Sequence, residues 1–241
     1  MAFAATSVFP ASGSVGGGNT VYIMGTDLDD TTEVEFDGEE ALWEVQNANL
    51  LAVVVPPGSA GPANVVVTDG TTPSTLSSAY TYNAFDSSEK FGPVLNSRYR
   101  VDVNLGTIAA PIWEELIGIQ DLKPAVDPTK QPDDDYSQGI WMSEVITGLT
   151  WGLEIKLRRR KGLVSGIYHP AQEKLRTTAE KAGSEGLVQI RYYDTDNGPD
   201  TYRGMVSVGW SPDGGDKTTL DVVTVTLAGN GEREVVPNPA A

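Results

Sequence analysis

The sequence predicts a mainly β protein with two domains and one helix, and three observations support this fold class. Residues 1–82 contain short runs of β-forming residues between clusters of Gly, Pro, Asn and Asp, without helical periodicity. The end of the chain alternates apolar and polar residues around two turn sequences, as antiparallel strands do. The charge distribution also changes, because all 17 Lys and Arg lie after residue 84. We therefore expect domains at 1–84 and 98–241, with a linker at 85–97.

The first domain is expected to be a small β-sandwich whose strands turn alternate residues toward a shared core. Its turn clusters have a distinctive order along the chain. They include Pro10-Ala11-Ser12-Gly13 with Gly16-Gly17-Gly18, then Phe36-Asp37-Gly38, and later Val55-Pro56-Pro57-Gly58. The five expected strands are 21–24, 34–36, 50–55, 65–67 and 80–82. In this order of strands and turns, the segment resembles an IPT/TIG domain, an immunoglobulin-like module.

The second domain begins with an alternating strand at 99–104 and contains a longer alternating strand at 149–158. Between them, 119–139 is expected to be a long loop with three prolines and five aspartates, and a loop of this length is more often a contact element than a simple connection. One helix is predicted from Pro170 to Gly183, with an apolar stripe formed by Ala171, Leu175 and Ala179 or Ala182.

The chain ends in a predicted three-strand meander. Turns at 194–200 and 211–216 separate its strands, and 220–228 forms the last one. This block, with Asp133-Asp134-Asp135-Tyr136 and Gly148-Leu149-Thr150-Trp151 upstream, resembles the tail tube (major tail) proteins of long non-contractile-tailed bacteriophages. The resemblance implies a tail-tube-type β-sandwich or barrel with one flanking helix. It also implies subunits that close into hexameric rings and stack into the hollow tube through which the genome leaves.

Composition argues against several classes of function. The chain has no cysteine and one histidine, which excludes disulfides and thiolate chemistry and leaves little for acid–base relays. We expect no enzyme activity and no cofactor. A hydrolase with paired carboxylates remains an alternative, although spacing selects no pair. Asp133, Asp134 and Asp135, with Asp121 and Asp127 nearby, could offer oxygens to Ca²⁺. A solvated acidic loop is the preferred interpretation, so no metal site is predicted.

The candidate functional residues are subunit contacts. The only cationic run, at 158–161, is expected to dock on acidic groups of a neighbouring subunit, with a solvated strand end as the alternative. In the last strand, Val223, Val225 and Leu227 can face the core while Thr224 and Thr226 face a lumen. The proposed contact residues are Asp121, Asp127, Asp133, Asp134, Asp135, Arg158, Arg159, Arg160 and Lys161.

The resemblance also implies a cellular context. The chain would be made in a host cytoplasm and located in the virion tail, with no membrane insertion. Its partners would be other copies of itself, the tape measure protein, the tail terminator and the baseplate or tip, with DNA passing transiently. The acidic first domain would decorate the outside, where it could bind bacterial surface polymers. The competing interpretation is a two-domain β protein that binds cell surfaces or carbohydrate.

Overall fold

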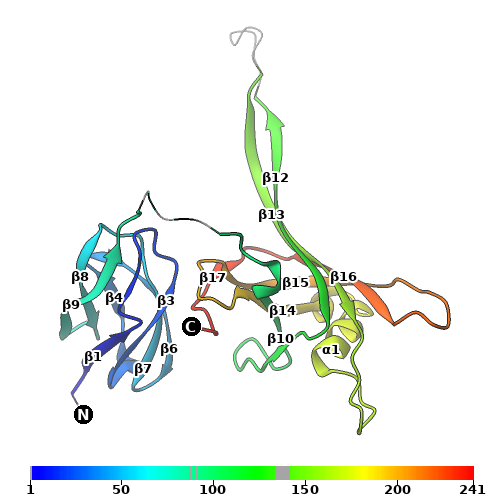
Figure 1. The fold of residues 1–241 in the computed structure, drawn as a ribbon, viewed down its shortest axis with the longest axis horizontal. Coiled ribbons are helices and arrows are strands. Elements are labelled where there is room, and N and C mark those ends of the chain that lie inside the picture. The colour runs from blue at the N-terminus through cyan, green and yellow to red at the C-terminus, as the bar shows by residue number, and fades with distance from the viewer. Residues whose placement is uncertain (1, 87, 89, 91, 134–141) are drawn as a thin grey trace. The chain divides into compact units, whose positions relative to one another are not determined.

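The computed structural model describes residues 2–86, 88, 90, 92–133 and 142–241. The chain divides into two compact units. The first contains Met1–Arg100, Tyr192–Tyr202 and Glu234–Ala241, and the second contains Val101–Arg191 and Arg203–Arg233. Figure 1 shows the strands of both units. The division into domains at 1–84 and 98–241 remains a prediction.

The N-terminal part of the first unit is built from two sheets, in agreement with the predicted immunoglobulin-like sandwich. The four-stranded sheet has the order β1-β3-β7-β6, and the five-stranded sheet has the order β2-β9-β8-β4-β5. Neighbouring strands are antiparallel except β2 and β9. The strands are β1 (Ala4–Phe9), β2 (Ser12–Ser14), β3 (Thr20–Thr26), β4 (Glu33–Phe36), β5 (Glu39–Glu40), β6 (Leu42–Asn47), β7 (Leu50–Val54), β8 (Gly61–Thr68) and β9 (Pro73–Asn83).

All five strands predicted for this domain are confirmed, whereas β1, β2, β5 and β6 were not predicted. The missed strands are short or half-exposed, so apolar runs do not mark them; β6, for example, exposes Leu42 and Val45. Aromatic rings stabilise the core between the sheets. Tyr80 makes edge-to-face contacts with Phe36 and Tyr82, at centroid distances of 5.3 and 5.1 Å. Packing of this kind replaces the disulfide that the chain cannot form.

The remaining strands form one eight-stranded sheet with the order β11-β10-β14-β15-β16-β13-β12, and β17 also pairs with β15. The predicted meander is confirmed, because β14, β15 and β16 are neighbours in that order. The sheet is open, since β11 and β12 occupy its two edges. The strands are β10 (Tyr99–Asn104), β11 (Trp113–Glu115), β12 (Ile119–Pro132), β13 (Glu144–Arg158), β14 (Leu187–Asp194), β15 (Thr201–Pro212), β16 (Val222–Gly229) and β17 (Glu234–Val235).

The long loop predicted from Ile119 was wrong over its first fourteen residues, which form β12. The three prolines misled the prediction because a proline has no N–H to donate. Here Asp133 donates its N–H to Ser143 O, toward β13. The N–H positions of residues 132, 128 and 124 therefore point the opposite way, to the open edge of the sheet. Prolines at these positions remove no hydrogen bond from the β12–β13 ladder.

The predicted helix start is confirmed, because α1 (Pro170–Ala179) begins at its proline. Ala171 and Leu175 are buried as predicted. The helix ends four residues before Gly183. The N–H of Lys181 donates to Thr178 O at 3.0 Å, a tighter turn that replaces the last helical turn. Short 3-10 helices lie at Leu28–Asp30, Asn96–Arg98 and Gly183–Gly186.

Candidate subunit-contact surfaces

One largely exposed feature of the second unit is the outer part of the β12–β13 hairpin, residues 123–133 and 142–150, which we call the arm. Figure 1 shows it projecting from the sheet. None of its described residues is buried. Residues opposite each other in an antiparallel pair share a face, and Val126 is paired with Trp151 while Pro128 is paired with Leu149. The other face carries Asp127 opposite Thr150. This apolar face of β13 is buried in the core nearer the sheet. On the arm, the same face continues but is exposed.

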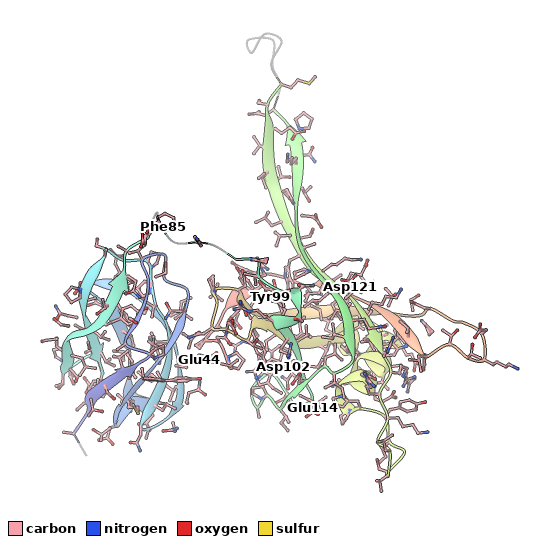
Figure 2. The ribbon with its side chains drawn as sticks, viewed as in Figure 1. Glu44, Phe85, Tyr99, Asp102, Glu114 and Asp121 are labelled. Carbon is pink, nitrogen blue, oxygen red and sulfur yellow. The ribbon has the colours of Figure 1, made fainter. Side chains whose placement is uncertain are left out.

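The predicted acidic contact residues are spread along this hairpin. Asp121 lies where the arm meets the sheet (Figure 2), with its Oδ2 3.2 Å from Lys123 Nζ. The same ammonium is 2.9 Å from Glu154 Oε1, and this hydrogen bond raises the pKa of Lys123. Asp127 and Asp133 are exposed on the arm. Asp134 and Asp135 lie outside the described residues.

The predicted cationic run does not act as one uniform patch. Arg158 is the last residue of β13 and is half-buried. Arg159 is engaged within its own chain: its Nη2 donates to Glu173 Oε1, and its guanidinium lies 4.1 Å from the ring centre of Tyr168. Arg160 and Lys161 are exposed. Within this run, these two residues project most freely toward solvent.

Gln172 is a structural residue that sequence reasoning missed. Its side chain is fully buried near the start of α1. Its Oε1 accepts the N–H of Arg160 at 2.9 Å, and its Nε2 donates to Ile117 O at 2.8 Å and Arg158 O at 3.0 Å. The amide thus holds the helix, the end of β13 and the chain before β12 together. A buried polar residue is invisible in an apolar stripe, so the pattern gave no signal for it.

A second missed feature is the loop Gly162–Tyr168, which we call the knob. It is closed by a β-bridge between Lys161 and Tyr168 and by a hydrogen bond from Gly162 N to Ile167 O at 2.8 Å. Leu163 and Val164 are fully exposed at its tip. The available signal was three apolar residues among Gly and Ser directly after the cationic run.

The face of β16 that bears Thr224 and Thr226 carries small polar groups, as predicted, because Val223, Val225 and Leu227 are buried on the opposite face. Across the three central strands, this face forms rows of paired residues. The rows are Lys156–Thr224–Ser211, Glu154–Thr226–Gly209 and Gly152–Ala228–Ser207. Asp213 Oδ2 lies 3.0 Å from Lys156 Nζ, and Asp213 Oδ1 accepts a hydrogen bond from Thr224 Oγ1. The face is thus mostly small and uncharged, with its few charges of both signs.

The described residues hold no group of three or more His, Asp or Glu side chains that could bind a metal ion. No helix within the same residues has the length and apolar character needed to cross a bilayer.

Comparisons with known proteins give results for both structure and sequence. One similar solved structure is the tail of an empty gene transfer agent particle with C6 symmetry, with a TM-score of 0.46 and 11% identity, covering 59% of this chain and 98% of that one. Another is the virion of a native gene transfer agent particle, with a TM-score of 0.44, 10% identity and coverage of 58% and 97%. The SPP1 tail tube gives a TM-score of 0.42, 9% identity and coverage of 59% and 80%. No curated protein matches the chain in sequence.

The sequence of the first domain matches a family model described as IPT/TIG domain over residues 5–83. This range covers both sheets of the sandwich, from β1 to β9. Residues 5–83 are therefore an IPT/TIG domain.

Proposed function

We propose that this chain is the structural subunit of a hollow tail tube of the kind found in long non-contractile phage tails, and that it is not an enzyme. The observation that carries the proposal is the central sheet of the second unit. Its β15–β16–β13 region buries one face, and the rows of residues on the other face are mostly small, with Glu154 and Lys156 as the exceptions. Among the described residues, no strand pairs with the outer side of its two edge strands, β11 and β12. Such a sheet is suited to line a tube built from many copies.

Ring closure follows from the two open edges. Edge-to-edge pairing between β11 of one copy and residues 119–123 of β12 in the next, the part of β12 that lies before its first proline, would satisfy the backbone groups that a free edge leaves unpaired. The two edges are different strands, so the contact joins unlike surfaces, and such contacts form closed rings when the rotation between copies closes. Hexameric rings, as the sequence resemblance implies, would then stack into the tube.

The proposed lumen is the face with Thr224 and Thr226. Passing DNA is retarded where Lys or Arg neutralise its phosphates, because each such contact releases counterions and adds affinity. On this face the Lys156 ammonium is already paired with Asp213 at 3.0 Å. The remaining side chains of the three rows are small or anionic. A wall of this composition would let a genome slide during ejection.

The arm is the proposed contact to the neighbouring ring, together with the cationic residues at the end of β13. The acidic partners would be Asp121, Asp127, Asp133, Asp134 and Asp135, and the basic partners would be Arg158, Arg160 and Lys161. Arg159 would contribute indirectly, because its guanidinium is bound to Glu173. Opposite charges at such a contact select its register more than its strength.

The remaining parts of the proposal concern location and other partners. The IPT/TIG domain has ten carboxylates and no Lys or Arg among residues 1–84, so it would crowd a narrow channel and belongs outside. There it could contact bacterial surface polymers. The tube would occupy the virion tail and meet tape measure, terminator and baseplate or tip proteins, after assembly in a host cytoplasm.

Negative-stain electron microscopy of the purified chain over a concentration series, with light scattering for mass, tests this function. Rings or long hollow tubes are expected, with protrusions on their outer surface. A folded chain that stays monomeric at high concentration, and that binds a surface glycan, would replace the proposal with the competing surface-binding protein.

A further inference from the structure

The knob is an ordered turn that presents apolar side chains to solvent. Its backbone is fixed by the bridge between Lys161 and Tyr168 and by a hydrogen bond from Gly166 N to Gly162 O at 2.9 Å. Leu163 and Val164 are fully exposed, and Ile167 is 69% exposed. Apolar groups held together at the tip of an ordered loop are typical of a contact surface.

A matching cavity lies where the arm joins the body of the same unit. This arm-base pocket has a volume of about 650 Å³. Its apolar wall contains Val126, Leu149 and Trp151, and Leu149 is 69% exposed. The Trp151 indole N–H already donates to Gly231 O at 2.8 Å, so the ring offers an apolar surface. Gly229 and Gly231 also line the pocket, and a Cβ added at Gly231 would meet nothing within 4 Å.

The charges around the two features are complementary. From Arg158 to His169 the sequence contains four Lys and Arg and no carboxylate. Near the pocket, from Asp121 to Asp127, it contains two Asp and one Lys. The carboxylate of Glu232 also belongs to the pocket lining, beside Arg233. Attraction between these segments would bring a knob toward an arm and disfavour contact between two arms or two knobs.

The two features cannot meet within one molecule. Figure 1 shows the arm and the yellow-green loop after β13 projecting in opposite directions from the second unit. A contact between them therefore joins different surfaces of two copies, and it leaves a free knob at one end and a free pocket at the other. We propose that Leu163 and Val164 of one copy bind the arm-base pocket of a second copy. This contact rests on the proposed function, because it takes another copy of the chain as the partner.

The absence of cysteine from the sequence permits a direct test by engineered cross-linking. The double variant Leu163→Cys with Leu149→Cys places one thiol on the knob and one in the pocket. Mild oxidation of the full chain at assembling concentration should give a ladder of covalent multimers on a non-reducing gel, because each copy cross-links at both ends. The matched control pairs Leu163→Cys with Ile108→Cys, since Ile108 is also an exposed apolar residue of the second unit. The control should stop at dimers.

Equal ladders from both pairs, or only dimers from the Leu163 and Leu149 pair, would overturn the contact. Electron microscopy of the same samples separates this inference from the tube itself. Tubes without the specific ladder would refute the contact and leave the tube function standing. A specific ladder without tubes would support the contact and refute the tube function, and the absence of both would refute both.

A second variant measures the contribution of the knob without new thiols. Leu163→Ser with Val164→Ser should leave the melting temperature of the monomer unchanged, because both side chains are fully exposed. The concentration needed for assembly should rise by about tenfold or more, since the variant removes the apolar groups that the contact buries. An unchanged assembly concentration would contradict the proposal.

Discussion

Single polar side chains connect the strands of the eight-stranded sheet, and helix α1, at the places where these elements meet. Gln172 makes three hydrogen bonds from a fully buried position. Arg98 connects the entry to β10 with the β14–β15 turn, because its Nε lies 3.2 Å from Asp194 Oδ1. Arg191 Nε lies 2.8 Å from Asp102 Oδ2 in the neighbouring strand, and its guanidinium lies 4.7 Å from the Trp113 ring centre. These residues fix local geometry that apolar packing alone would leave adjustable.

Replacing Gln172 with Ala should lower the free energy of unfolding of the second unit by about 2–5 kcal/mol, since each buried group left unpaired costs about 1–3 kcal/mol. Urea unfolding followed by tryptophan fluorescence measures this change. Thr177→Ala is the matched control on the same helix, because the Thr177 hydroxyl donates to Glu173 O and Lys174 O within that helix. Equal stabilities of the two variants would show that the hydrogen bonds of the Gln172 amide do not stabilise the second unit.

The Asp213→Asn variant should melt at a lower temperature than the unmodified chain at pH 7. This difference should disappear at acidic pH. The hydrogen bond from Thr224, and then the pairing with Lys156, hold the pKa of the Asp213 carboxyl below its ordinary value of 3.8. A carboxyl with a lowered pKa in the folded state contributes stability well above pH 3.8, and this contribution is lost as the pH falls through the folded-state pKa. Calorimetry from pH 7 to pH 3 should therefore show the two melting temperatures converging. A constant difference would exclude ionisation of Asp213 as its source.

At the scale of the element, the β12–β13 hairpin has two parts with different surroundings. Near the sheet, Leu153, Ile155 and Leu157 are buried on one face of β13. Beyond Trp151 the same face is exposed on the arm. The transition occurs at the indole, which lies close to glycines of neighbouring strands. A Cβ added at Gly229 would lie 2.4 Å from Trp151 Nε1. These glycines thus allow the ring to close the end of the core.

Gly229→Ala should destabilise the second unit by about 1–3 kcal/mol, because the new methyl group would overpack against a ring held by its hydrogen bond to Gly231 O. Gly148→Ala is the matched control on β13, since a Cβ there would come no closer than 3.8 Å to Thr129. Thermal unfolding monitored by near-UV circular dichroism compares the two. Similar melting temperatures for both variants would show that the Trp151 ring can shift to accommodate the methyl group at little cost in stability.

The elements best predicted from the sequence are those whose burial repeats along the chain. Strand β10 was predicted with its observed bounds, and in β16 the buried Val223, Val225 and Leu227 alternate with Thr224 and Thr226. The β12 part of the arm was predicted as a loop because proline is common in turns. These prolines do not disrupt the β12–β13 ladder because their nitrogens face the open edge of the sheet, and the sequence does not show which edge is open. The pairing of β12 with β13 depends on tertiary contacts, so local sequence patterns do not predict it.

The candidate contact residues were predictable only where the sequence itself shows the relevant property. The charges of Asp127, Asp133, Arg160 and Lys161 are visible in the sequence, and all four side chains are exposed. That Arg159 is bound to Glu173 could not be predicted, because the two residues come together only when α1 packs beside the end of β13. The subunit contacts themselves remain predictions.

At the scale of the whole molecule, the residues that we propose for tube assembly are different from those that stabilise the fold. The described residues of the arm bury nothing within their own chain, so the arm can be shortened without opening the core. Asp127 and Thr150 are opposite each other in the ladder. Replacing residues 128–149 with Asn-Gly should therefore close a regular two-residue hairpin at this pair. The shortened chain should melt at an unchanged temperature and form no tubes.

Electron microscopy and light scattering of the shortened chain provide the measurement. Normal tubes would exclude the arm as the contact between rings. A matched deletion of the first domain should have the opposite effect: a chain that starts at Phe91 is expected to form tubes that lack outer protrusions. If that chain is folded and monomeric, the IPT/TIG domain takes part in assembly.

The prolines of β12 have a consequence for what this protein can polymerise into. A free strand edge is a template for the addition of another strand, and repeated addition leads to amyloid-like fibres. Proline replaces the outward N–H group at residues 124, 128 and 132, so a strand from another molecule finds no regular row of donors there. The projecting hairpin can thus present its apolar face to a partner while its backbone resists uncontrolled growth of the sheet.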